Sequence, residues 1–171
     1  MDDDASNADA VAQLGYLKAV LGETAAAITM LQRAVLLDRL GQAEARPWLF
    51  HLLREAGRAD EAQAELRALR EATGLADAWL PTLAGYLAGE LAHPALLAAA
   101  ATPPRDGAAD ERAHRRLAAW LHCGLVAEHA GEAAVAVDAF ARALAGDRHD
   151  QWEWALALHR LGELTGELPP R

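Results

Sequence analysis

Histidine and cysteine are the residue types here with the widest chemical repertoire, and their spacing limits what they can do. The chain has seven His and one Cys, and it lacks the H-E-x-x-H pattern of zinc peptidases. His122 and His129 are seven residues apart, so in a helix their backbones are separated by roughly 10 Å, whereas metal-binding pairs favour i, i+4 spacing. Cys123 directly follows His122, and helix neighbours diverge by about 100°, so adjacency does not make a Cys–His dyad.

Two further histidines have an acidic residue four positions later. His51 precedes Glu55 in this way, and His159 precedes Glu163. This spacing is typical of contacts on the surface of one helix. The sequence also lacks a Gly-rich phosphate loop and a nucleophile elbow. We therefore expect no catalytic residue, no bound metal and no cofactor, and we do not expect an enzyme.

Composition predicts that helices carry the whole fold. The chain of 171 residues contains 43 Ala and 28 Leu, whereas Val, Ile and Thr together number only 13. Ala and Leu lose little conformational entropy in a helix, while the β-branched types favour strands. A chain of this length buries enough apolar surface for one domain or a short array of repeats. The fold class expected is all-α.

Charge and hydropathy argue against nucleic acid as a partner and against a membrane-spanning segment. The formal net charge is −9, which disfavours nucleic acid because phosphate binding needs a positive surface. The arginines at positions 112, 115 and 116 indicate a solvated helix face. No apolar run reaches the ~20 residues that span a bilayer, and the acidic N-terminus lacks the features of a signal peptide. We expect a cytoplasmic protein; an exported mature form stays an alternative.

Glycines and prolines divide the chain into regular helical segments. We expect helices near 8–21, 24–38, 42–56, 59–73, 76–88, 92–101, 108–129, 132–145 and 149–165. Turns are expected at Gly22, Gly57, Gly89 and Gly131, because glycine accepts the left-handed conformation that ends a helix. Paired prolines predict a loop at 102–107, and residues 1–7 and 167–171 are expected to be a disordered acidic N-terminus and a tail.

The helical segments repeat a pattern of small and bulky residues. Five residues after a turn glycine stands an alanine, and nine residues after it stands a bulky apolar residue. The three sets are Gly22, Ala27 and Leu31; Gly57, Ala62 and Leu66; and Gly131, Ala136 and Phe140. We expect the alanines where paired helices cross most closely and the bulky residues one turn later on the same face. Such hairpins bury their apolar faces by stacking.

This pattern resembles the tetratricopeptide repeat. The best match runs from Trp120, Cys123 and Gly124 through Phe140 to Ala143, and Leu14–Gly15 fits the first unit. The resemblance implies a right-handed α-solenoid of antiparallel helix pairs in a single domain, 8–166. Its units would be 8–41, 42–74, 75–107 and 108–147, with a capping helix at 149–165. The third unit fits poorly, because Pro94 stands where a small residue is expected.

In the family, first helices line a concave groove that binds a peptide or a helix of a partner. Carried over position by position, the groove residues are Tyr16, His51, Arg54, Glu55, Trp79, Leu83, Tyr86, Leu125, Glu128 and His129. Among the aromatic residues, Trp79, Tyr86 and Tyr16 are expected to be exposed. The resemblance therefore implies a non-catalytic scaffold or adaptor. The alternative is an assembly subunit or dedicated chaperone, including a homodimer, that associates through its terminal helices.

Overall fold

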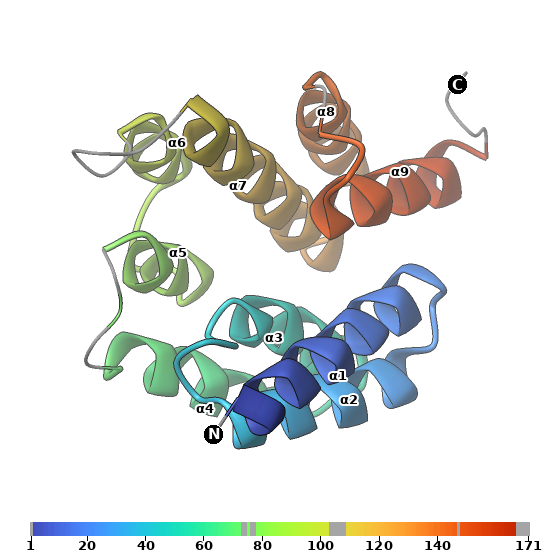
Figure 1. Ribbon diagram of the computed structural model, residues 1–171. Helices are drawn as coiled ribbons and strands as arrows, with labels where there is room; N and C mark the ends of the chain where they lie inside the picture. The colour runs from blue at the N-terminus through green and yellow to red at the C-terminus, as the bar shows by residue number, and fades with distance from the viewer. Residues whose placement is uncertain (1, 73–74, 76–77, 103–108, 147, 167–171) are drawn as a thin grey trace. The chain divides into compact units, whose positions relative to one another are not determined.

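The computed structural model describes residues 2–72, 75, 78–102, 109–146 and 148–166, with side chains from residue 7 onward. Within these ranges it contains nine α-helices and no strand, which confirms the all-helical prediction (Figure 1). Backbone contacts divide the chain into two compact units, Met1–Glu90 (unit 1) and Leu91–Arg171 (unit 2). The division falls inside the third predicted repeat.

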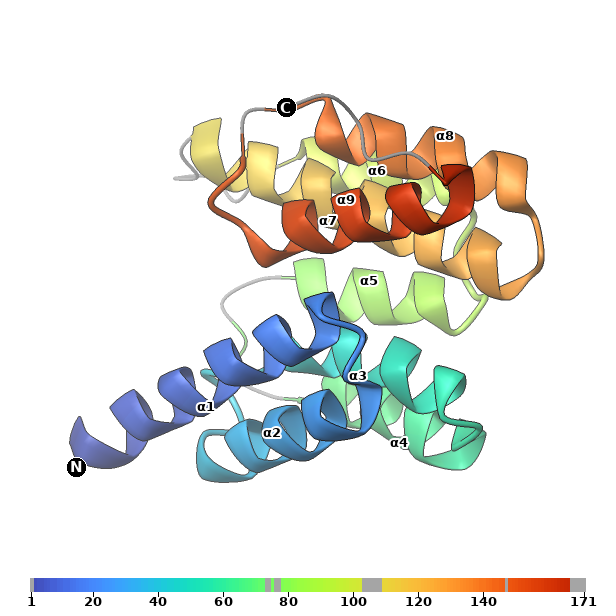
Figure 2. The same ribbon diagram turned by 90° about the vertical axis from the view of Figure 1, so that its right-hand side faces the viewer.

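Unit 1 contains five helices, each packed against the next along the chain. They are α1 (Asp2–Val20), α2 (Thr24–Leu37), α3 (Ala45–Glu55), α4 (Ala59–Arg70) and α5 (Trp79–Leu87). Packing joins α1 to α2, α2 to α3, α3 to α4 and α4 to α5. Figures 1 and 2 show α1 and α2 side by side, running in opposite directions. The order of contacts is that of stacked helical hairpins.

The first helix begins earlier than the sequence predicted. α1 starts at Asp2, within the segment 1–7 for which the sequence predicted disorder. Acidic residues in the first turn favour a helix, because they interact well with the positive end of its dipole. The expected tail at 167–171 and most of the expected loop, 103–107, lie outside the described residues.

Unit 2 is built around one long helix. Its helices are α6 (His93–Ala101), α7 (Ala109–His129), α8 (Ala133–Leu144) and α9 (Trp152–Thr165). The 21-residue α7 packs against α6, α8 and α9. α9 also packs against α8, so α7, α8 and α9 contact one another in every pairing. Residues from all parts of this unit can therefore meet along α7.

Four helix ends in the described chain share one turn geometry. Gly22, Gly57, Gly89 and Gly131 each have φ between 74° and 79°. At Gly22 the amide donates a hydrogen bond to Ala19 O at 3.1 Å, and the Glu23 amide donates to Lys18 O at 2.9 Å. The other three turns have the same two bonds. This is the Schellman motif, which needs a left-handed residue and therefore glycine. The turns predicted at these glycines are confirmed.

Three hairpins also share one packing register. The residues five, nine and twelve positions after the turn glycine are all at most 3% exposed, and they are Ala27, Leu31, Ala34; Ala62, Leu66, Leu69; and Ala136, Phe140, Ala143. Two of the bulky residues press against a glycine sixteen positions earlier. A Cβ on Gly15 would lie 2.6 Å from Leu31 Cδ2, and one on Gly124 would lie 2.4 Å from Phe140 Cε1. These contacts leave no room for a side chain at the crossing.

Candidate functional site

Seven of the ten predicted groove residues lie in unit 1, on α1, α3 and α5. Tyr16 of α1 is half-buried, and its ring centroid lies 4.9 Å from that of the buried Trp48 of α3. Arg54 is exposed, with its guanidinium carbon 5.5 Å from the centroid of the Phe50 ring. The structure therefore places Tyr16 at an aromatic contact between two first helices and leaves Arg54 facing solvent.

Several of these residues are not available to a partner. His51, Trp79, Leu83 and Leu125 are buried. Trp79 is only 7% exposed, so the prediction that it faces solvent is wrong. The reason is that Trp79, Leu83 and Leu87 recur every four residues along α5, which gives this helix one apolar face, and a helix buries such a face. His51 is likewise not a surface residue, although Glu55, four positions later, is exposed.

The three predicted groove residues in unit 2 hold that unit together. Leu125 is buried in α7. Glu128 is half-buried and lies 3.5 Å from Nη1 of Arg160, which belongs to α9. The Nδ1–H of His129 donates a 2.7 Å hydrogen bond to the carbonyl oxygen of Leu125. Both polar residues therefore serve contacts inside the unit, one across to α9 and one within α7.

The residues with the widest chemical repertoire lie in the core of unit 2. His122 is 2% exposed and Cys123 is 3% exposed. Burial lowers the pKa of His122 to about 3, because a charged imidazolium loses its hydration there. Within the described part of the chain, no group of three or more His, Cys, Asp or Glu could hold a metal ion. His122 is therefore a neutral core residue at ordinary pH.

Exposed leucines are concentrated on the first hairpin. Among the described residues, eight large apolar side chains are exposed, and six of them lie between positions 14 and 40. Along α1 and at the residue that follows it, the exposed set is Leu14, Leu17 and Leu21, and we call it the open α1 face. Their spacing of three and four residues places them on one side of a helix.

Comparison with the next hairpin shows why this face is unusual. Thirty-five residues later, the spacing of the turn glycines, Leu49 and Leu52 stand on α3 where Leu14 and Leu17 stand on α1. Leu49 and Leu52 are 0% and 5% exposed, whereas Leu14 and Leu17 are 43% and 39% exposed. α2 packs against α3. The apolar positions of α1 that correspond to Leu49 and Leu52 therefore differ from them in being partly exposed.

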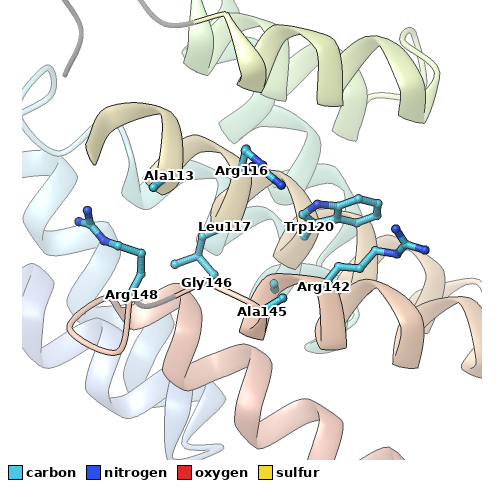
Figure 3. Close-up of a pocket in the computed structure, with 9 residues that line it drawn as sticks. Ala113, Arg116, Leu117, Trp120, Arg142, Ala145, Gly146 and Arg148 are labelled. Carbon is cyan, nitrogen blue, oxygen red and sulfur yellow. The ribbon is translucent and has the colours of Figure 1, made fainter. Parts of the chain in front are cut away.

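Unit 2 contains a pocket lined by three arginines (Figure 3). It has a volume of about 290 Å³ and lies between α7, α8 and the turn after α8. Its lining residues are Ala113, Arg116, Leu117, Trp120, Arg142, Ala143, Ala145, Gly146 and Arg148. Nε of Arg142 donates a 2.7 Å hydrogen bond to Asp138, and its guanidinium lies 5.0 Å from the Trp120 ring centroid. The pocket therefore combines guanidinium groups with an apolar floor.

The sequence did not predict this pocket, and the solvated helix face predicted for the arginines at 112, 115 and 116 is wrong for Arg115. Within the predicted cluster of arginines, Arg115 is buried and pairs with Glu111 at 2.8 Å, while Arg116 lines the pocket. Arg142 and Arg148 come from a later segment, and nothing in their spacing from Arg116 signals that the fold joins them. A second hollow, of about 380 Å³ in unit 1, is lined by Arg39, Leu40, Arg46, Ala68, Glu71 and Ala72.

No described helix is long and apolar enough to cross a membrane. Comparisons with family models, with curated proteins and with solved structures find no match for this chain.

Proposed function

We propose that this chain is a non-catalytic scaffold or adaptor of the tetratricopeptide-like class, a right-handed solenoid of helix pairs that binds a helix of a partner protein. The observation that carries the proposal is the open α1 face. Large apolar side chains gathered on an exposed surface mark interaction sites in soluble proteins. The shared turns and the shared hairpin register support the tetratricopeptide-like architecture.

The repeat itself suggests what fits this surface. On α3, the corresponding leucines are buried, and α2, the helix that precedes α3, packs against α3. A partner helix with an apolar stripe at three- and four-residue spacing would cover Leu14 and Leu17 in the same way. Leu14 and Leu17 are already more than half buried, so covering the area that remains exposed would contribute about 1 kcal/mol each. A contribution of this size can decide whether a small protein–protein interface is stable.

A second candidate function is assembly of this chain with itself. The observation that favours it is that the exposed stripe lies on a terminal helix, α1, where its spacing matches the seam of paired helices. In that case the covering helix comes from another copy of the chain. The two candidates differ in the mass of the purified protein, since only self-assembly gives a multiple of the chain mass without a partner.

The test uses a double variant, Leu14→Glu with Leu17→Glu. The matched control is Val135→Glu, which places the same charge on an exposed apolar position of α8. Light scattering gives the mass of each purified protein, and quantitative affinity purification from native cells compares the proteins retained. We expect the double variant to bind its partner, or its second copy, roughly 30-fold more weakly, while the control does not change. Equal masses and equal recovery in all three proteins would refute the proposal.

A further inference from the structure

The three-arginine pocket of unit 2 is a positive site on an acidic chain. The net charge is −9, yet the described lining residues include Arg116, Arg142 and Arg148 and no acidic residue. Guanidinium groups are the side chains best suited to bind carboxylates, because they offer several donors in one plane. A local concentration of this kind on a chain of opposite net charge attracts anionic ligands to one place.

Arg116 and Arg148 retain capacity to bind an anion, while Nε of Arg142 is paired with the exposed Asp138. Within the described part of the chain, Arg116 is exposed and no carboxylate lies within ion-pair distance of it. Arg148 lies 3.5 Å from Asp110 and 3.6 Å from Asp150, and both carboxylates are largely exposed. Its Nε is buried and has no hydrogen-bond partner among the described residues. Exposed ion pairs contribute little, so an incoming carboxylate can replace these contacts at small cost.

The shape of the pocket indicates an extended ligand. Figure 3 shows Arg148 on one side and Arg142 on the other, with Leu117 and Gly146 between them. Guanidinium groups that do not converge on one point suit several spaced carboxylates better than one compact anion. The floor between them is apolar, with Leu117, Ala113 and Ala143. At about 290 Å³, the pocket is at the small end of the range for ligand sites.

We propose that this pocket binds an acidic peptide segment in which carboxylates flank an apolar side chain. The carboxylates accept hydrogen bonds from the arginines, and the apolar side chain packs on Leu117. Nucleic acid does not fit, because its binding needs an extended positive surface and the rest of the chain is acidic. This site uses none of the leucines of the open α1 face, so it adds a second binding surface and does not depend on the proposed function.

The experiment measures binding of a capped synthetic peptide of alternating glutamate and leucine to the full chain by calorimetry. The peptide with glutamine in place of glutamate and inorganic phosphate serve as comparison ligands. The test variant is Arg116→Gln with Arg142→Gln, and the matched control is Arg112→Gln, which removes an exposed arginine of α7 that does not line the pocket. NMR of the arginine Nε–H groups reports which guanidinium groups contact the ligand.

We expect the acidic peptide to shift the Nε–H signals of Arg116 and Arg142 and to bind more weakly as salt is raised. The double variant should bind it at least about tenfold more weakly, which corresponds to one lost charge-assisted hydrogen bond, while Arg112→Gln stays within about twofold. The variant that carries Leu14→Glu and Leu17→Glu should bind the peptide normally, so a failure of one proposal can be distinguished from a failure of the other. No binding by the wild type, equal binding by the double variant, or equal binding of phosphate or the glutamine peptide would overturn the inference.

Discussion

The buried histidine of α7 makes the stability of the protein depend on pH. His122 is fully enclosed, and burial lowers its pKa in the folded chain to about 3 from an ordinary value of 6.5. Between these values the unfolded chain binds a proton at this position and the folded chain does not. The free energy of unfolding therefore falls as pH falls through this window, and it is unaffected by this group above the window.

The size of the effect follows from the two pKa values. Each pH unit inside the window costs about 1.4 kcal/mol, so acidification from pH 7 to pH 5 should remove about 2 kcal/mol of stability. That is a substantial part of the 5–15 kcal/mol that typically stabilises a domain. The effect continues to grow down to about pH 3, but carboxylates also take up protons below about pH 5, so pH 5 to 7 is the range in which the contribution of His122 can be measured separately.

The assay is urea unfolding followed by circular dichroism at pH 7, 6 and 5, for the wild type and for His122→Leu. Leucine keeps an apolar side chain of comparable size in the core and cannot bind a proton. The other six histidines are common to both proteins, so the difference between the two pH profiles isolates His122. We expect the wild type to lose about 2 kcal/mol more than the variant between pH 7 and pH 5. Parallel profiles would refute the conclusion that His122 is held neutral by burial.

Two further predictions concern packing. Gly124→Ala places a Cβ 2.4 Å from the Phe140 ring, so thermal unfolding should show a loss of about 1–3 kcal/mol. Adding Phe140→Leu should recover part of that loss, because leucine is smaller than phenylalanine and vacates part of the space that the new Cβ enters; a second variant no more stable than the first would contradict the crossing geometry. Trp79→Ala should destabilise the chain by about 3–5 kcal/mol in urea unfolding, because Trp79 is buried. A loss below about 1 kcal/mol, typical of surface positions, would show that Trp79 is not a core residue.

Much of the fold could be predicted because its signals are local. A glycine that must adopt positive φ, as Gly22 and Gly131 do, sets a helix end within a few residues whatever surrounds it. Alanine at a fixed distance after that turn predicted a buried position on the second helix, and the structure buries Ala27 and Ala136 completely. The acidic residues at the start of the chain predicted disorder, whereas the structure has a helix from Asp2. Acidic residues are typical of disordered segments, but they also stabilise the first turn of a helix.

The candidate sites were less accessible from the sequence. Trp79 was placed in a groove by its position in a repeat, but burial depends on which face of α5 is apolar, and the third repeat is irregular. The arginine pocket requires α7 and the turn after α8 to meet, and sequence spacing does not reveal such a meeting. The open α1 face could not be predicted, because the exposure of a leucine depends on the helices that pack over it. Leu14 and Leu49 occupy equivalent positions in the repeat, but only Leu14 is exposed.

The order of helix packing has a consequence for how the chain reaches its native state. In the described structure, every extensive contact joins either two consecutive helices or two helices with one helix between them in the sequence. Short sequence separations mean that little loop-closure entropy is lost before a contact forms, and such topologies fold rapidly. Each hairpin can therefore form early around its own glycine turn. During translation, each hairpin could therefore begin to pack as it leaves the ribosome, before the C-terminal helices have been synthesised.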